Sequence, residues 1–173
     1  NDDVVVNTSY GAVTASNENI TLPAGDYTLI ACSSGDDVPV AAFEQPVYGV
    51  SHPFTIVAGE VTEIEEPLVC TLLQCKVTVA YNDDFLAAVT GAGKTTVEVT
   101  AGSPLEYVLN ANKTYDQSSG YFAVNGTTMT VNFKGHINGN EGVTMSKSFQ
   151  GIAPKQWRQI KFIQKKNEQG QAT

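Results

Sequence analysis

The clearest pattern of apolar and polar positions lies in the longest apolar run of the chain, residues 67–81. Within this run, residues 76–81 alternate polar or small side chains with apolar ones, as a strand with one buried face does. Residues 68–73 are apolar almost throughout, which is typical of a strand covered on both sides. Turn residues at 82–84 close the run. We therefore predict a central strand here, joining two β lobes.

Short strand–turn–strand units recur on both sides of this run. Residues 20–31 place two alternating stretches around Pro-Ala-Gly-Asp, and residues 54–64 repeat the arrangement around Ala-Gly. Weaker echoes occur at 97–102 and 149–162. Because the spacing is not constant, the units predict a β-sandwich rather than a solenoid.

The rest of the chain also reads mainly as short strands. Residues 85–89 predict one helical turn, and Asn125-Gly126 predicts a hairpin between residues 122–124 and 129–131. Residues 165–173 have no periodicity and are expected to form a tail or a linker. The expected strands cover residues 4–6, 11–15, 95–100, 105–109, 120–124, 127–133, 143–149 and 156–164.

Composition supports an all-β fold and adds a marked division of charge. Thr, Val, Gly and Asn are plentiful, and only 16% of the 173 residues are charged, which is typical of sheets and turns rather than helices. Residues 1–67 contain eleven Asp and Glu but no Lys or Arg, whereas the remainder holds seven acids and all ten bases. We therefore predict an acidic N-terminal lobe over 1–67, a C-terminal lobe over 68–164 and a tail over 165–173.

The net charge of −8 argues against two classes of partner. Binding to nucleic acid and to anionic membrane surfaces depends on Lys and Arg, which are scarce here. No apolar run approaches the ~20 residues that span a bilayer. Any attachment to a membrane is expected to come from an N-terminal lipid anchor absent from this chain.

Residues 88–96 nearly match a phosphate-binding loop, but the context argues against nucleotide binding. The Gly-Lys-Thr end is present, whereas Ala88 stands where the motif opens with Gly. Such a loop must open a helix, and residues 96–100 alternate like a strand instead. A glycine-rich hairpin loop is the better interpretation.

No catalytic, cofactor-binding or metal-binding residue can be assigned, and we expect a protein that is not an enzyme. His52 and His136 have no metal-ligand spacing, and no Gly-x-Ser-x-Gly is present. Acidic pairs lack the spacing of a calcium loop and are expected to be ordinary turn residues. These pairs are Asp2-Asp3, Asp36-Asp37 and Asp83-Asp84.

The odd number of cysteines argues against a disulfide framework. Cys70 and Cys75 lie ~16 Å apart in one extended strand, too far to bridge, while pairing of Cys32 with Cys70 stays open. We expect small buried thiols. Trp157 and the seven tyrosines could line a sugar platform, but a Trp on a strand is more often part of the core.

Several segments, taken in order, resemble one family. Residues 22–31 (Leu-Pro-Ala-Gly-Asp-Tyr-Thr-Leu-Ile-Ala), 41–49, 54–60 and 75–85 together are similar to fimbrillin-like surface lipoproteins of gut Bacteroidales, and most to an uncharacterised fimbrillin-related domain family. The resemblance covers roughly residues 18–165. It implies two transthyretin-like (Greek-key) β-sandwich lobes in tandem, export through a lipoprotein signal, and display on the outer membrane or in a fimbrium. It implies no catalytic residues.

These observations lead to two hypotheses about partners and one competing function. An exposed strand edge is expected to accept a strand from a neighbouring chain. The acidic first lobe is expected to dock on the mildly basic second lobe of another copy, with a merely solvated acidic surface as the alternative. The competing function is a glycan-binding module.

Overall fold

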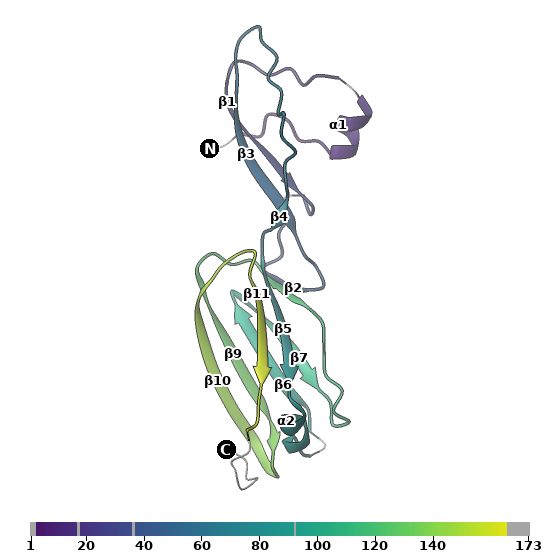
Figure 1. The fold of residues 1–173 in the computed structure, drawn as a ribbon, viewed down its shortest axis with the longest axis vertical. Coiled ribbons are helices and arrows are strands. Elements are labelled where there is room, and N and C mark those ends of the chain that lie inside the picture. Colours follow the sequence, from purple (N-terminus) through teal and green to yellow (C-terminus); the bar gives the residue numbers. More distant parts are fainter. Residues whose placement is uncertain (1–2, 17, 36, 92, 166–173) are drawn as a thin grey trace. The chain divides into compact units, whose positions relative to one another are not determined.

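The structure is a computed structural model that describes residues 3–16, 18–35, 37–91 and 93–165. The described residues form eleven strands and two short helices, so the all-β prediction is confirmed (Figure 1). The helices are α1 (Tyr10–Ser16) and α2 (Asp83–Ala88). The strands are β1 (Gly25–Cys32), β2 (Ala41–Phe43), β3 (Tyr48–Ile56), β4 (Thr71–Leu72), β5 (Cys75–Tyr81), β6 (Thr95–Ala101), β7 (Ser103–Leu109), β8 (Gly120–Phe122), β9 (Thr127–Ile137), β10 (Asn140–Ile152) and β11 (Trp157–Phe162).

The strands divide into three sheets. Two four-stranded sheets, ordered β11-β5-β8-β2 and β10-β9-β6-β7, form the layers of a sandwich. The third sheet has the order β1-β3-β4. All pairings in the sandwich are antiparallel except that of β11 with β5, which is parallel.

Alternation of side chains builds the core of this sandwich. Along β5 every second residue is buried, as predicted, and β6 shows the same pattern. The side chains of the two layers meet in one apolar cluster, in which the rings of Phe133 and Phe162 lie 5.4 Å apart. Burial of this apolar surface is the main force that holds the two layers together.

The chain divides into two compact units that interleave in sequence. The first contains Asn1–Leu29 and His52–Pro67, and the second contains Ile30–Ser51 and Leu68–Thr173. The predicted lobes are consecutive, 1–67 and 68–164, whereas residues 30–51 belong to the second unit here. Residues 30–51 belong to the second unit because of their pairing. Strand β2 hydrogen bonds to β8, and the Val47 N–H donates to the buried Gln74 Oε1 at 2.8 Å.

In the first unit, two strands pair in an antiparallel sense. Thr55 donates to the Asp26 carboxylate at 2.7 Å, and Tyr27 stacks on Phe54 with ring centroids 5.8 Å apart. These contacts place Asp26 opposite Thr55 and Tyr27 opposite Phe54. Since each residue forward on β1 meets the preceding residue of β3, Thr28 lies opposite Pro53 and Leu29 lies opposite His52. The described residues of this unit show two paired strands and a helix rather than two packed sheets.

The predicted strand at residues 11–15 is wrong, because this segment forms α1. The Ser9 hydroxyl accepts from the Ala12 N–H at 3.2 Å and so caps the start of the helix. The Thr14 and Ser16 hydroxyls donate to backbone carbonyls within the same turns. These local hydrogen bonds favour a helix in a segment where we predicted a strand. The predicted strand at residues 4–6 is also absent.

The predicted hairpin at Asn125-Gly126 is wrong as a pairing, although the turn exists. Gly126 has φ +65°, a conformation that glycine adopts readily. The strands on either side belong to different sheets, since β8 pairs with β5 and β2 while β9 pairs with β6 and β10. The turn therefore carries the chain across the sandwich. The helical turn predicted at 85–89 is confirmed as α2, shifted by two residues at its start.

The central run is not one strand. Residues 71–72 join the sheet of β3 as β4, whereas β5 starts at Cys75 in the sandwich. Val69 is 72% exposed and Cys70 is also exposed, so this part of the run is not covered on both sides. Between the two strands Gln74 is fully buried, and its Oε1 accepts from the Val47 N–H. Likewise β3 ends at Ile56, and a turn from Val57 to Glu60 follows in place of the second strand predicted there.

Candidate interaction surfaces

The segment that resembles a phosphate-binding loop is a structural loop. Thr95 opens a strand rather than a helix, and Lys94 forms an ion pair with the Glu106 carboxylate on the neighbouring strand. A Cβ on Gly93 would lie 2.7 Å from His136 Nε2, so the glycine lets the loop pack against this histidine. The described residues therefore form a glycine-rich loop, but it joins α2 to β6 rather than the two strands of a hairpin. Residue 92 lies outside them.

The acidic pair that the structure describes in full lies at the start of a helix. Asp83 and Asp84 occupy the first turn of α2, where carboxylates interact favourably with the helix dipole. Asn82 caps this helix by accepting from the Phe85 N–H at 2.9 Å. Asp2 and Asp36 lie outside the described residues. Across the described part of the chain, no group of three or more His, Cys, Asp and Glu side chains could hold a metal ion. No helix found there is long and apolar enough to cross a bilayer.

The three cysteines are free thiols in different environments. Cys75 is fully buried, as expected, and burial raises its pKa from an ordinary 9.0 to about 11. Cys32 is half-buried, and its Sγ lies 3.5 Å from the Ser34 hydroxyl. Cys70 is exposed, contrary to the expectation of buried thiols, because the strand expected around it does not form there.

Trp157 lies on the surface, so the interpretation as a core residue is wrong. Its side chain is 65% exposed at the start of β11. The indole Nε1–H donates to the Thr78 hydroxyl at 3.1 Å, and the Lys76 ammonium lies 5.4 Å from the centre of the ring. Both neighbours belong to β5, with Lys76 directly opposite Trp157 in the ladder. The alternation of β11 places Ile160 and Phe162 against the core, which directs Trp157 to the outer face.

The outer face of the other layer has different chemistry. It carries short polar side chains that bond to one another across the strands, such as Thr128 to Gln150 at 2.7 Å and Ser146 to Asn132, also at 2.7 Å. Thr130 and Ser148 form a third pair at 3.3 Å. These hydroxyls and amides satisfy one another, so this face offers few free groups to a partner. This contrast makes the face that carries Trp157 the better candidate for an interaction surface.

The first unit has an apolar face that is only partly covered. None of its described residues is buried, whereas the second unit contains a full core. Tyr27 and Leu29 on β1 and His52, Phe54 and Ile56 on β3 lie on one face of the pair and are half-buried. Two strands alone are marginally stable in water, so this face and its edges are the natural place for another strand to add.

One edge of this strand pair is protected and the other is open. The Thr62 hydroxyl donates to the Thr55 carbonyl at 3.0 Å from the side away from β1. By strand alternation, the backbone of Pro53 faces the same outer side, where proline has no N–H to offer. The residues opposite them, Asp26 and Thr28, must then direct their backbone groups to the free edge of β1. No proline or lysine guards that edge.

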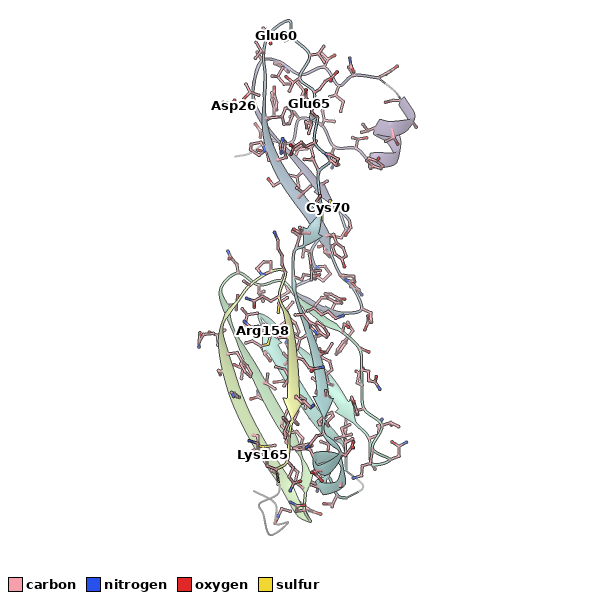
Figure 2. The ribbon with its side chains drawn as sticks, in the orientation of Figure 1. Asp26, Glu60, Glu65, Cys70, Arg158 and Lys165 are labelled. Carbon is pink, nitrogen blue, oxygen red and sulfur yellow. The ribbon has the colours of Figure 1, made fainter. Side chains whose placement is uncertain are left out.

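A shallow hollow lies beside β3 in the same unit. Its lining comes from His52 and Phe54 and from the returning segment 62–66. That segment supplies three carboxylates, from Glu63, Glu65 and Glu66 (Figure 2 labels Glu65). The hollow is open and acidic. It brings His52 near carboxylates, a proximity that its position in the sequence did not suggest.

The fold and these surfaces define an all-β sandwich protein whose distinctive features are exposed faces and strand edges. The chain belongs to the family described as "Domain of unknown function (DUF4493)", whose model matches residues 1–173. No curated protein matches the chain. Among solved structures, it is similar to a putative cell adhesion protein from Bacteroides fragilis at 10% identity and a TM-score of 0.39. The match covers 89% of this chain and 65% of that protein. At this TM-score the likeness carries no argument about function.

Proposed function

We propose that the protein is a non-enzymatic module of the cell surface or a fimbrium, acting in adhesion or assembly through strand-mediated protein contacts. The free edge of β1 is the acceptor. The proposal takes up the resemblance of residues 18–165 to fimbrillin-like surface lipoproteins, with a lipid anchor upstream of this chain as the attachment to the outer membrane.

The observation that carries the proposal is the incomplete first unit. Its described residues include none that is buried, and its two paired strands present a half-exposed apolar face. A strand added at β1 would form main-chain hydrogen bonds with Asp26 and Thr28. Its alternate side chains would extend the face formed by Tyr27 and Leu29. Addition would thereby supply both the missing ladder and the missing apolar cover.

The experiment compares Thr28→Pro with Thr28→Val in the full chain. Proline removes an outward N–H and blocks strand addition, while valine keeps that N–H and suits a strand. Sedimentation velocity over a concentration series would measure self-association. Hydrogen exchange would measure protection of the Asp26 and Thr28 amides. We expect protection of both amides to rise with concentration in the wild type and in Thr28→Val, and the remaining Asp26 amide to stay unprotected in Thr28→Pro. Association that survives Thr28→Pro, with the Asp26 amide exchanging freely, would refute the assignment of this edge.

A glycan-binding module is the second candidate, and the exposure of Trp157 favours it. Aromatic rings exposed on a sheet can stack against sugar rings. A glycan array probed with the wild type and with Trp157→Ala tests this function. Hits that disappear in the variant would support it, and an array without hits would count against it.

A further inference from the structure

We infer that the outer face around Trp157 is a docking surface for the acidic segment 60–66 of a second copy of this chain. The inference deepens the proposed function by naming the partner. It rests on that function because it requires the protein to act through contacts between protein surfaces. It uses a different surface from the edge of β1, so the experiments on the two surfaces can give different outcomes.

Trp157 has the properties of an anchor residue at a protein interface. Its Nε1–H is already bonded to Thr78, and the Lys76 ammonium lies over its ring, so the indole is held in place before any partner arrives. It nevertheless leaves 65% of its side chain exposed. Binding would then cost little ordering of this side chain, and tryptophan is among the residues that most often dominate the energy of an interface.

The charge around Trp157 has one sign. Alternation places Lys76 on β5 and Lys161 on β11 at outer positions, with uncharged residues at the other outer positions of these two strands. Lys161 follows Trp157 by four residues on the same face, roughly 13 Å along the strand. An occupant should therefore be an extended acidic segment with an apolar side chain for the indole.

Segment 60–66 of the first unit has this chemistry. Its carboxylates come from Glu60, Glu63, Glu65 and Glu66, and it lies within residues 1–75, which contain no Lys or Arg (Figure 2 labels Glu60 and Glu65). Between the acids, Val61 is 73% exposed and Ile64 is 36% exposed. Either apolar side chain can pack on the indole while neighbouring carboxylates approach Lys76 and Lys161. Opposite charges at this distance give specificity and speed association more than they add affinity.

The two surfaces belong to different parts of the chain, so two copies can exchange them reciprocally about a two-fold axis or join head to tail. In the head-to-tail case, each copy uses its acidic segment on one neighbour and its Trp157 face on another. Such a contact closes into a ring or extends as a filament, according to the rotation between copies. Either product would suit a protein that assembles at a surface.

Charge reversal in two full-length variants tests the inference. One carries Lys76→Glu and Lys161→Glu, and the other carries Glu63→Lys and Glu65→Lys. Each variant alone should self-associate roughly tenfold or more weakly than the wild type, because like charges then face each other. An equimolar mixture should recover association, since each altered surface meets its complement. That recovery excludes misfolding as the cause of the loss.

Two further variants complete the experiment. Trp157→Ala should also weaken self-association roughly tenfold or more. Lys134→Glu, on the polar outer face of the other layer, is the matched control and should leave it unchanged. Association of the wild type should weaken between low and high salt.

Several outcomes overturn the inference. These are a wild type that stays monomeric at high concentration, charge variants that associate normally, and a mixture that does not recover. A Trp157→Ala variant that loses glycan-array binding while associating normally would assign the face to sugars instead. Loss of association in Thr28→Pro alone would keep the proposed function and reject this surface. Loss in the charge variants alone would keep this surface and reject the edge of β1 as the acceptor.

Discussion

Tyr107 and Gly120 meet where the two layers of the sandwich are joined. The Tyr107 hydroxyl, carried by β7, accepts from the Gly120 N–H at 3.1 Å and donates to the Val77 carbonyl at 3.0 Å. Val77 and Gly120 are opposite residues of β5 and β8 in the other layer. The phenol therefore stands between two backbone groups of the facing sheet. Gly120 permits this approach, since a Cβ there would lie 2.3 Å from the hydroxyl oxygen.

Replacing Tyr107 with Phe should destabilise the second unit by about 1–3 kcal/mol, because it leaves a buried N–H and a buried carbonyl without their partner. Tyr81→Phe is the matched control. The Tyr81 hydroxyl is buried with no hydrogen-bond partner among the described residues, so its removal should be nearly neutral or slightly stabilising. Urea unfolding of the two variants measures the difference. Equal losses of stability would contradict the bridging role of Tyr107.

Gly120→Ala should cost roughly 1–3 kcal/mol, because the new methyl group meets the Tyr107 hydroxyl and the Leu105 Cδ1, which lies 2.9 Å from the Cβ position. The double variant with Tyr107→Phe should lose less than the sum of the two single changes, since Phe removes the nearer clash. A double-mutant cycle by urea unfolding gives the coupling energy. Strict additivity would show that the methyl group and the hydroxyl do not compete for the same space.

The second unit should lose stability as pH rises above about 9. Burial is the main cause that raises the pKa values of Tyr81 and Tyr107 above the ordinary 10.0. Burial likewise raises the pKa of Cys75 from 9.0 to about 11. The folded state then keeps protons that the unfolded chain releases. Stability from these groups is complete below pH 9 and falls as pH rises through their folded-state pKa values.

Urea midpoints at pH 8, 9.5, 10.5 and 11 check this alkaline loss. Tyr81→Phe should reduce the decline by removing one of the three groups. A midpoint that stays constant up to pH 11 would refute the assignment of these burial effects.

A thiol reagent should distinguish the cysteines. Cys70 is exposed and should react at once at pH 8, whereas Cys75 is buried with a raised pKa and should react only on unfolding. Mass spectrometry after brief labelling with iodoacetamide would locate the modified residues. Cys70→Ser should remove the rapid phase, and rapid labelling of Cys75 would contradict its burial.

The sequence by itself determined the period of the strands and the positions of many turns. The alternation at 76–81 and 95–100 depends only on neighbouring residues, and β5 and β6 show it. The acidic character of residues 1–67 follows directly from composition. The Asn125-Gly126 turn could also be read locally, because glycine is favoured at positive φ.

Only the tertiary structure decided which strands pair and which faces are covered. Whether a turn leads to a neighbouring strand or to the opposite layer depends on partners distant in sequence, as the separation of β8 from β9 shows. The exposure of Trp157 has the same origin, since its place on β11 suits either face until Ile160 and Phe162 pack on the core. Likewise, the open edge of β1 follows from the pairing that sets Pro53 opposite Thr28. Hydrophobic patterning acts within a few residues, whereas coverage depends on what the rest of the chain places above each face.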